Sequence, residues 1–226
     1  MDLPPSDTPA VCWRRQIGAR LVAWWPAKMI GTPVAIAVFF VAYFAVLRHP
    51  LHPPAIMPAT AVDRLVGFTP GALPLYLSLW LYVCLVPALL NDRREFIAYA
   101  LAVVGMSAVG LGIFFAWPTT VAPAQIDWSQ HPAFAFLKTV DASGNACPSL
   151  HAAFAVFTGF LLGRLGRQVH AGGLVRGLSW LWCLGILYST VATGQHVFID
   201  ALAGAVLGAV TAWTHLRLLR RLPDTP

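Results

Sequence analysis

Charged residues are scarce in this 226-residue chain. Asp, Glu, Lys and Arg make up only 11% of it, whereas an average soluble domain carries about a quarter. Apolar residues account for 58%, and the mean hydropathy is +0.69. This composition excludes an ordinary soluble domain and is typical of an integral membrane protein.

Cysteine is scarce as well. The chain has four cysteines, with no Cys-X-X-Cys pair, scattered over predicted interior, membrane and exterior positions: Cys12, Cys84, Cys147 and Cys183. A disulfide framework or a zinc site would need a more regular spacing of such residues. Neither is expected here. Internal repeats and low-complexity segments are also lacking.

Long apolar runs, by contrast, fill most of the chain, and five or six of them approach the roughly 17–25 residues that cross a bilayer. They lie at about residues 30–47, 72–90, 96–116, 150–166, 174–192 and 198–217. Glycine and polar residues interrupt the run at 150–166 most. We predict an all-α polytopic membrane protein whose six transmembrane helices form one bundle over residues 30–218.

Two shorter segments flank this predicted domain. Residues 11–29 mix arginine and lysine with tryptophan, which favours an amphipathic stretch at the membrane interface within a cytoplasmic segment 1–29. Residues 219–226 form a short tail. The first long apolar run starts near residue 30 without a small-residue cleavage site after it, so we expect no cleavable signal peptide.

The 15 Lys and Arg residues are distributed unevenly over the two sides that six spans define. Only Arg48, Arg64 and Lys138 fall on one side. The side of both termini carries the other twelve: Arg14, Arg15, Arg20, Lys28, Arg93, Arg94, Arg164, Arg167, Arg176, Arg217, Arg220 and Arg221. Because cytoplasmic loops collect Lys and Arg, we predict a multi-pass protein of the cell inner (plasma) membrane with both termini cytoplasmic. Topology accounts for the net charge of +6 without nucleic acid.

Two polar motifs stand where predicted spans begin. Residues 145–151, Asn-Ala-Cys-Pro-Ser-Leu-His, lead into the fourth span, and residues 196–200, His-Val-Phe-Ile-Asp, lead into the sixth. Ionisable residues in such places are rare and usually functional. Both spans run inward from the external (periplasmic) surface, and helix N-termini bind anions through free N–H groups and the helix dipole. We therefore predict a phosphate site there.

The residue types suit phosphoryl transfer. His196 and Asp200 are four apart and share one helix face, so the carboxylate would accept the Nδ1 proton and leave Nε2 as a nucleophile. Ser149 offers a hydroxyl and His151 an imidazole where a bound phosphate would lie. Continuing the stripe by fours gives Gly204 and Gly208, small residues that permit close helix packing below the site.

Each residue also has a plainer interpretation. His196 is then an interfacial histidine, Asp200 and Ser149 are helix caps, and His151 bonds to a loop carbonyl. A metal bound by the two histidines and Asp200 is a further alternative, although too few ligands are evident. The joint occurrence of the residues favours catalysis.

Pro148-Ser149-X-His151 followed by Ser189-X6-His196-X3-Asp200 resembles the second and third signature motifs of the type 2 phosphatidic acid phosphatase superfamily. Leu150, the stretch from Asp63-Arg64 to Trp80, and Asp141 with Asn145 are similar to its inositol phosphorylceramide synthase branch. The resemblance covers roughly residues 58–208. It implies a six-helix core in which His196 attacks phosphorus, Asp200 orients it, His151 protonates the leaving oxygen and Ser149 binds phosphate, without metal or organic cofactor.

The chain departs from the family pattern in its cations. The first motif, a Lys and an Arg-Pro, is missing at residues 116–120, and Thr190 stands where the third motif has arginine. Arg64 and Lys138 are, besides Arg48, the outer-side candidates to replace these cations. Asn145 and Thr190 are further substrate-binding candidates. Segment 117–149, which carries several aromatic residues, is expected to fold as a lid that excludes water.

This cation deficit bears on the substrate. A phosphate monoester carries nearly two negative charges at neutral pH and a diester one, so the deficit favours transfer of a phospho-head group from a membrane lipid to an alcohol, as in an inositolphosphotransferase. Hydrolysis of a lipid phosphate monoester by water is the alternative. A transporter or scaffold fits less well, because a transporter places ionisable residues near the midplane. The oligomeric state is left open.

Overall fold

The structure, a computed structural model, describes residues 13–122, 131–134 and 144–221. Helices dominate it, so the prediction of an all-α polytopic membrane protein is confirmed. The helices are α1 (Trp13–Val22), α2 (Trp25–Arg48), α3 (Ala61–Val66), α4 (Leu73–Leu77), α5 (Leu79–Leu89), α6 (Arg93–Ala116), α8 (Leu150–Gln168), α9 (Gly173–Ala192) and α10 (Phe198–Leu219), with a 3-10 turn at Pro70–Ala72.

Five segments are long and apolar enough to cross a membrane, and they match five of the six expected spans: 25–48, 70–89, 93–116, 173–192 and 198–219. The sixth expected span corresponds to α8, which packs against α5, α9 and α10 in the middle of the bundle. Most of its residues are buried against protein. A helix that is shielded from lipid tolerates polar residues such as Arg164. That α8 crosses the membrane stays a prediction.

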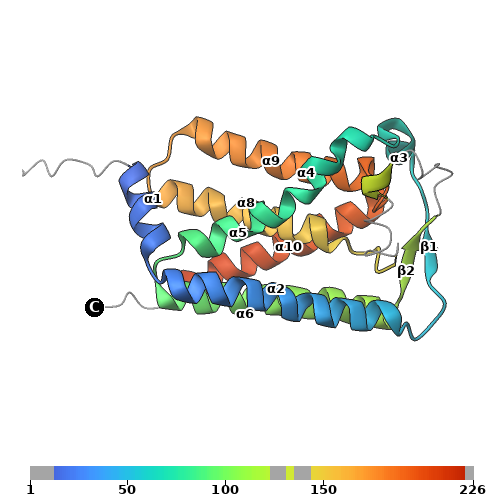
Figure 1. Cartoon of the computed structure of the whole chain (residues 1–226), viewed down its shortest axis with the longest axis horizontal. Helices are drawn as coiled ribbons and strands as arrows, with labels where there is room; N and C mark the ends of the chain where they lie inside the picture. The colour runs from blue at the N-terminus through green and yellow to red at the C-terminus, as the bar shows by residue number, and fades with distance from the viewer. Residues whose placement is uncertain (1–12, 123–130, 135–143, 222–226) are drawn as a thin grey trace, which may run out of the picture.

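The long helices run side by side, and the two ends of the bundle differ (Figure 1). Helix α1 lies across one end, where α10 also terminates. Lys28 is buried there and donates hydrogen bonds to the carbonyl oxygens of Arg20 and Ala88, at 2.7 and 2.9 Å. Helices α8 and α10 begin at the opposite end, beside α3 and the strands. The two polar motifs therefore meet at one end of the bundle, away from both described chain ends.

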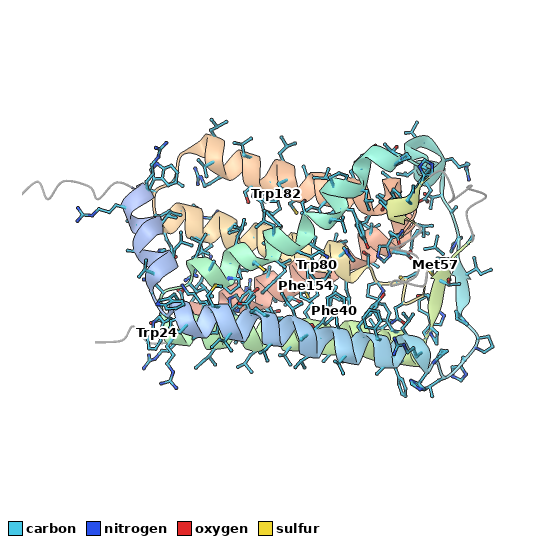
Figure 2. The ribbon with its side chains drawn as sticks, in the orientation of Figure 1. Trp24, Phe40, Met57, Trp80, Phe154 and Trp182 are labelled. Atoms are coloured by element: carbon cyan, nitrogen blue, oxygen red, sulfur yellow. The ribbon has the colours of Figure 1, made fainter. Side chains whose placement is uncertain are left out.

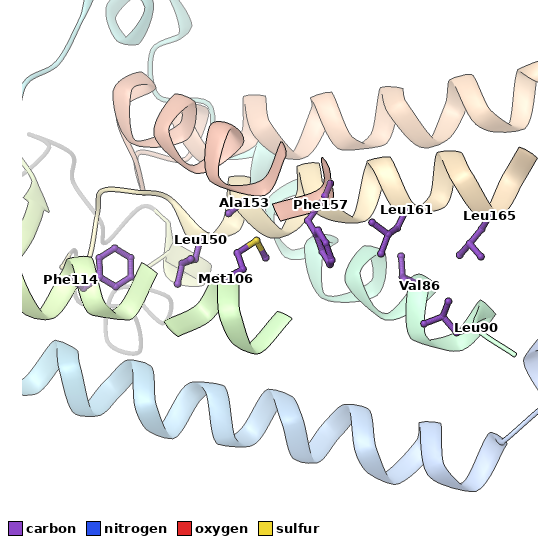
Figure 3. Packing of buried hydrophobic residues seen from close by; sticks show 10 residues of the cluster. Val86, Leu90, Met106, Phe114, Leu150, Ala153, Phe157, Leu161 and Leu165 are labelled. Atoms are coloured by element: carbon purple, nitrogen blue, oxygen red, sulfur yellow. The ribbon is translucent and has the colours of Figure 1, made fainter. Parts of the chain in front are cut away.

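Apolar side chains between α5, α6 and α8 form the main core (Figure 3). Val86, Met106 and Phe157 are almost fully buried there. Helix α10 approaches α8 closely on another side, where a Cβ atom on Gly204 would lie 2.0 Å from the Ser149 carbonyl oxygen and one on Gly208 2.3 Å from that of Ala153. The expected close packing below the site is confirmed, and it depends on these two glycines.

Two short strands, which the sequence did not indicate, close the site end. β1 (Ala55–Met57) pairs in parallel with β2 (Thr119–Val121). Thr119 continues the pairing on its other side: its carbonyl accepts from the Ala146 N–H at 3.2 Å, and its hydroxyl accepts from the Cys147 N–H at 2.8 Å. The strands thereby hold the backbone that leads into α8. Between residues 48 and 70 the chain is rich in proline, which interrupts helices, and α3 there is only six residues long.

Candidate active site

A backbone hydrogen bond joins the start of α8 to the start of α10. Ser149 is the N-cap of α8: its Oγ accepts from the Ala152 N–H at 3.3 Å, and its own N–H donates to the Asp200 carbonyl oxygen at 2.9 Å. Asp200 Oδ2 in turn accepts from the Val197 N–H at 3.0 Å, which caps α10. The capping roles anticipated for both residues are therefore present, and they fix the two helix starts against each other.

His196 lies in the turn between α9 and α10 with its ring held on one side. Its backbone N–H donates to the Thr190 carbonyl at 3.1 Å, and its Nδ1 lies 3.0 Å from the Ala146 carbonyl oxygen. Because a carbonyl oxygen only accepts, this contact places the proton on Nδ1 and the lone pair on Nε2. Nε2 is thereby available as a nucleophile.

Asp200 takes a different part from the one its spacing suggested. Its Oδ2 is 3.9 Å from His196 Nδ1, beyond hydrogen-bond distance, so the Ala146 carbonyl is the direct acceptor. The carboxylate is fully buried, and its Oδ1 has no hydrogen-bond partner among the described residues. At 3.9 Å from Nδ1, this carboxylate is close enough to stabilise the positive charge that develops on the His196 ring when Nε2 forms a bond.

His151 faces His196 from the first turn of α8. Their ring centroids are 6.1 Å apart. The His151 ring stacks on Tyr76 at 4.4 Å, and Trp80 meets it edge-on at 5.9 Å. The Tyr76 hydroxyl lies 3.5 Å from Nδ1, whereas the buried Nε2 has no partner within the described part of the chain. Tyr76 thus fixes the His151 imidazole on its Nδ1 side. Nε2 is left available for a ligand between the His151 and His196 rings.

Two uncharged amides complete this arrangement. Asn145 and Gln195 are each 6% exposed, and Nδ2 of the first and Nε2 of the second are buried without a partner among the residues described. Both line one cavity of ≈ 140 Å³ with His151 and His196. Buried hydrogen-bond donors nearly always have an acceptor in native proteins. The two amide groups without one therefore suit a ligand that supplies acceptors, such as an anion. Asn145 has a φ of 53°, a backbone conformation that asparagine tolerates.

The other predicted substrate-binding residues lie elsewhere. Arg64 is exposed on α3 and does not line the cavity. Thr190 is fully buried, and its hydroxyl donates to the Leu187 carbonyl at 2.7 Å. Lys138 lies outside the described residues, as does most of the expected lid. Of the described residues that line the cavity, none is lysine or arginine. The substrate-binding roles of Ser149, Arg64, Lys138 and Thr190 stay predictions.

Sequence reasoning missed Gln195 and the anchoring role of Asp63. Gln195 precedes His196 in the turn between α9 and α10. Its position indicates a functional role only once the structure of this turn is known. Asp63 Oδ1 accepts from the Phe198 N–H at 2.7 Å, and its Oδ2 accepts from the N–H and hydroxyl of Thr60. Burial opposes ionisation, but these hydrogen bonds outweigh it and lower the pKa of the Asp63 carboxyl below its ordinary value. Asp63 thus ties α3 to the start of α10.

A cysteine nucleophile at this site is disfavoured. Burial, together with the negative charge of Asp200, raises the pKa of the Cys147 thiol to about 11. Thiolate is the reactive form of cysteine, so Cys147 stays protonated at neutral pH. Within the described part of the chain, His, Cys, Asp and Glu side chains form no group of three that could hold a metal ion.

Helices long enough to cross a membrane, with a histidine pair and amide donors at one end, define a membrane protein with a polar site at one end of its bundle. The model of the PAP2 superfamily matches residues 73–214, which is well over half of the chain. The chain belongs to the PAP2 superfamily, and membership supports a lipid phosphatase or phosphotransferase type of activity. No curated protein and no solved structure matches the chain.

Proposed function

We propose that the protein transfers a phospho-head group from a membrane lipid to an alcohol, in the manner of an inositolphosphotransferase. His196 Nε2 attacks phosphorus and forms an N–P bond while the bond from phosphorus to the lipid oxygen breaks. His151 gives the leaving oxygen a proton. The acceptor alcohol then attacks phosphorus, the N–P bond breaks, and the alcohol proton passes to His151.

The observation that carries this proposal is the set of uncharged donors around the cavity. The Asn145 and Gln195 amides converge there beside the two histidines, whereas lysine and arginine are absent from its described lining. A diester phosphate carries one negative charge, while a monoester carries nearly two at neutral pH. Hydrogen bonds from neutral groups suit the smaller charge, so the lining favours a phosphodiester donor.

The position of the site supports external chemistry. The polar residues lie at the end of the bundle opposite to α1 and to the last turn of α10, where most basic residues of the sequence gather. Since basic residues accumulate on the cytoplasmic side, the proposal places the site at the external, periplasmic surface of the plasma membrane. The lipid donor would reach the site from that leaflet.

A donor and acceptor panel tests the activity. Purified protein is incubated with labelled phospholipids and labelled lipid phosphates, each with and without candidate lipid alcohols. We expect a new phosphodiester lipid that depends on both donor and acceptor and is lost in His196→Ala. The exposed His52 lies outside the site, so His52→Ala is the matched control and should retain activity. Inorganic phosphate from monoesters, with diesters untouched, would show a phosphatase instead.

A further inference from the structure

Helix α2 packs loosely on the bundle. It is described throughout its 24 residues, yet Lys28 is its one buried residue, although the helix contacts both α5 and α6. Protein interiors are normally packed to the density of organic crystals. Phe39, Tyr43 and Val46 pack against the core only in part, and open space remains on the inner side of the helix.

Two hollows account for this space. The first is the cavity at the histidines, and aromatic residues of α2 such as Phe40 and Tyr43 form one of its walls. The second, of ≈ 190 Å³, lies deeper between α2, α5 and α6. They share Phe39, Leu79, Trp80 and Phe154 in their linings. The two hollows therefore adjoin along α2, and together they are called the groove.

Aromatic rings line the junction between the hollows. The Phe39 and Phe154 centroids are 5.6 Å apart, and those of Phe40 and Trp80 are 5.1 Å apart. Phe40, Trp80 and Phe154 come from three different helices and lie close together in the middle of the bundle (Figure 2). The rings of these pairs meet at interplanar angles of 88° and 43°. The junction is therefore walled by apolar aromatic groups, which suit a hydrocarbon chain better than a bulky polar group.

Polarity changes along the groove. Its outer end carries Asn145, Gln195 and the two histidines. The deeper hollow is walled almost entirely by apolar side chains, such as Ile36, Val83 and Val103. An occupant that satisfies both ends has a phosphate at one end and a long apolar chain at the other.

The length of the groove points in the same direction. Its lining residues on α2 run from Gly31 to Phe44, which corresponds to about 20 Å at the rise of an α-helix. Half of the hydrocarbon core of a bilayer is roughly 15 Å. A groove that starts at the membrane surface and has this length reaches past the bilayer midplane.

We propose that the groove behind α2 holds one hydrocarbon chain of the lipid substrate, and that its deep end sets the longest chain accepted. This inference rests on the proposed lipid activity, because the phosphate of the same molecule occupies the outer end. Inside a bilayer a chain is already in apolar surroundings, so the groove discriminates by space rather than by hydrophobic gain. Larger side chains at the deep end should therefore change which chain lengths are accepted.

Two alanines on α2 provide a matched test. Both are exposed on the helix surface, but Ala35 lines the deep hollow, whereas Ala37 lines neither hollow. Donors with the same head group are compared, one with hexanoyl chains and one with palmitoyl chains. In Ala35→Phe the ratio of palmitoyl to hexanoyl kcat/KM should fall about tenfold, because overpacking a filled site is costly. Ala37→Phe should keep the wild-type ratio. Equal ratios in both variants would overturn the inference.

A labelling experiment separates the groove from the chemistry. A lipid with a photoreactive group on its terminal chain carbon should label the α2 segment 31–36 and the α6 segment 100–107 in wild type and in His196→Ala alike. Labelling spread evenly over the lipid-facing helices would overturn the groove. Loss of the proposed function is recognised differently, as failure of wild type to cleave any lipid phosphoester while the labelling pattern persists.

Discussion

The Nδ1 atom of His196 lies 3.0 Å from the carbonyl oxygen of Ala146, which is 50 residues earlier in the chain. The Ala146 backbone is itself bonded to Thr119 in β2. The orientation of the proposed nucleophile therefore depends on the segment leading into α8 and on the small sheet behind it. The helical neighbour Asp200 contributes charge and a cap rather than the direct hydrogen bond.

This geometry makes a prediction about Asp200→Asn. In a triad whose carboxylate holds the histidine tautomer, the corresponding change costs about 10⁴-fold in rate. Here the Ala146 carbonyl holds the tautomer, so we expect a loss of about 10²-fold, from the missing negative charge. Phosphotransfer or phosphatase rates of purified protein measure it, with thermal unfolding to verify the fold. A loss of 10⁴-fold in a well-folded variant would identify Asp200 as the orienting group.

The two histidines should fail differently. His196→Ala removes the nucleophile and should abolish turnover of every substrate. His151→Ala removes a general acid, which is typically worth 10²–10⁴-fold, and the loss should be far smaller for a nitrophenyl ester, whose leaving group departs without a proton. Initial rates on a lipid ester and a nitrophenyl ester measure this. Equal losses in both variants on both substrates would contradict the assigned roles.

The helices could be predicted well, for a simple physical reason. Crossing a bilayer requires a long apolar run, so runs such as 72–90 and 198–217 lie close to the observed segments 70–89 and 198–219. Helix α8 shows where the rule loses force. It is surrounded by other helices, so its interruptions by glycine and arginine cost little, and hydropathy alone gives a weak signal.

The site was predicted in part. Helix spacing and cap chemistry predicted that His151, His196 and Asp200 lie together, and they do, because the two helix starts lie side by side. Their catalytic roles stay predictions. The acceptor for His196 was missed, since a backbone carbonyl such as that of Ala146 bears no mark in the sequence. Gln195 was missed because its value comes from the cavity that it lines. The strands were missed because three-residue pairings depend on tertiary contacts.

A further prediction concerns Gly204, which brings α10 against α8 below the site. A Cβ atom there would lie 2.0 Å from the Ser149 carbonyl oxygen, and backbone must shift to accommodate it. Gly204→Ala should therefore cost about 1–3 kcal/mol or more of stability and should also lower activity, because Ser149 is bonded to Asp200. In Gly112→Ala on α6 the added Cβ meets nothing within 4 Å, so this control should be neutral or slightly stabilising. Thermal unfolding in detergent compares them.

Because of Asp63, the stability of the fold should depend on pH in the acidic range. The folded pKa of Asp63 lies below the unfolded value of about 3.9, so the carboxylate stabilises the fold above that value, and this contribution is lost as pH falls through the folded pKa. Asp63→Asn should weaken the bond to the Phe198 N–H by about 1 kcal/mol and flatten the stability profile below about pH 4. Asp92→Asn, which alters the N-cap of α6, should spare activity. Denaturation and activity assays at several pH values measure both variants; an unchanged acid profile in Asp63→Asn would count against this role.

The final prediction concerns which side of the membrane carries the site. Leu65 on α3 is 87% exposed beside the site end, and Leu174 at the start of α9 is 78% exposed at the basic end. Each is replaced by cysteine in a background that lacks the four native cysteines, and intact cells are treated with a membrane-impermeant maleimide. Leu65→Cys should react at once and Leu174→Cys only after permeabilisation, because basic residues remain in the cytoplasm. The reverse pattern would place the histidines in the cytoplasm, and donor and acceptor would then have to come from the inner leaflet.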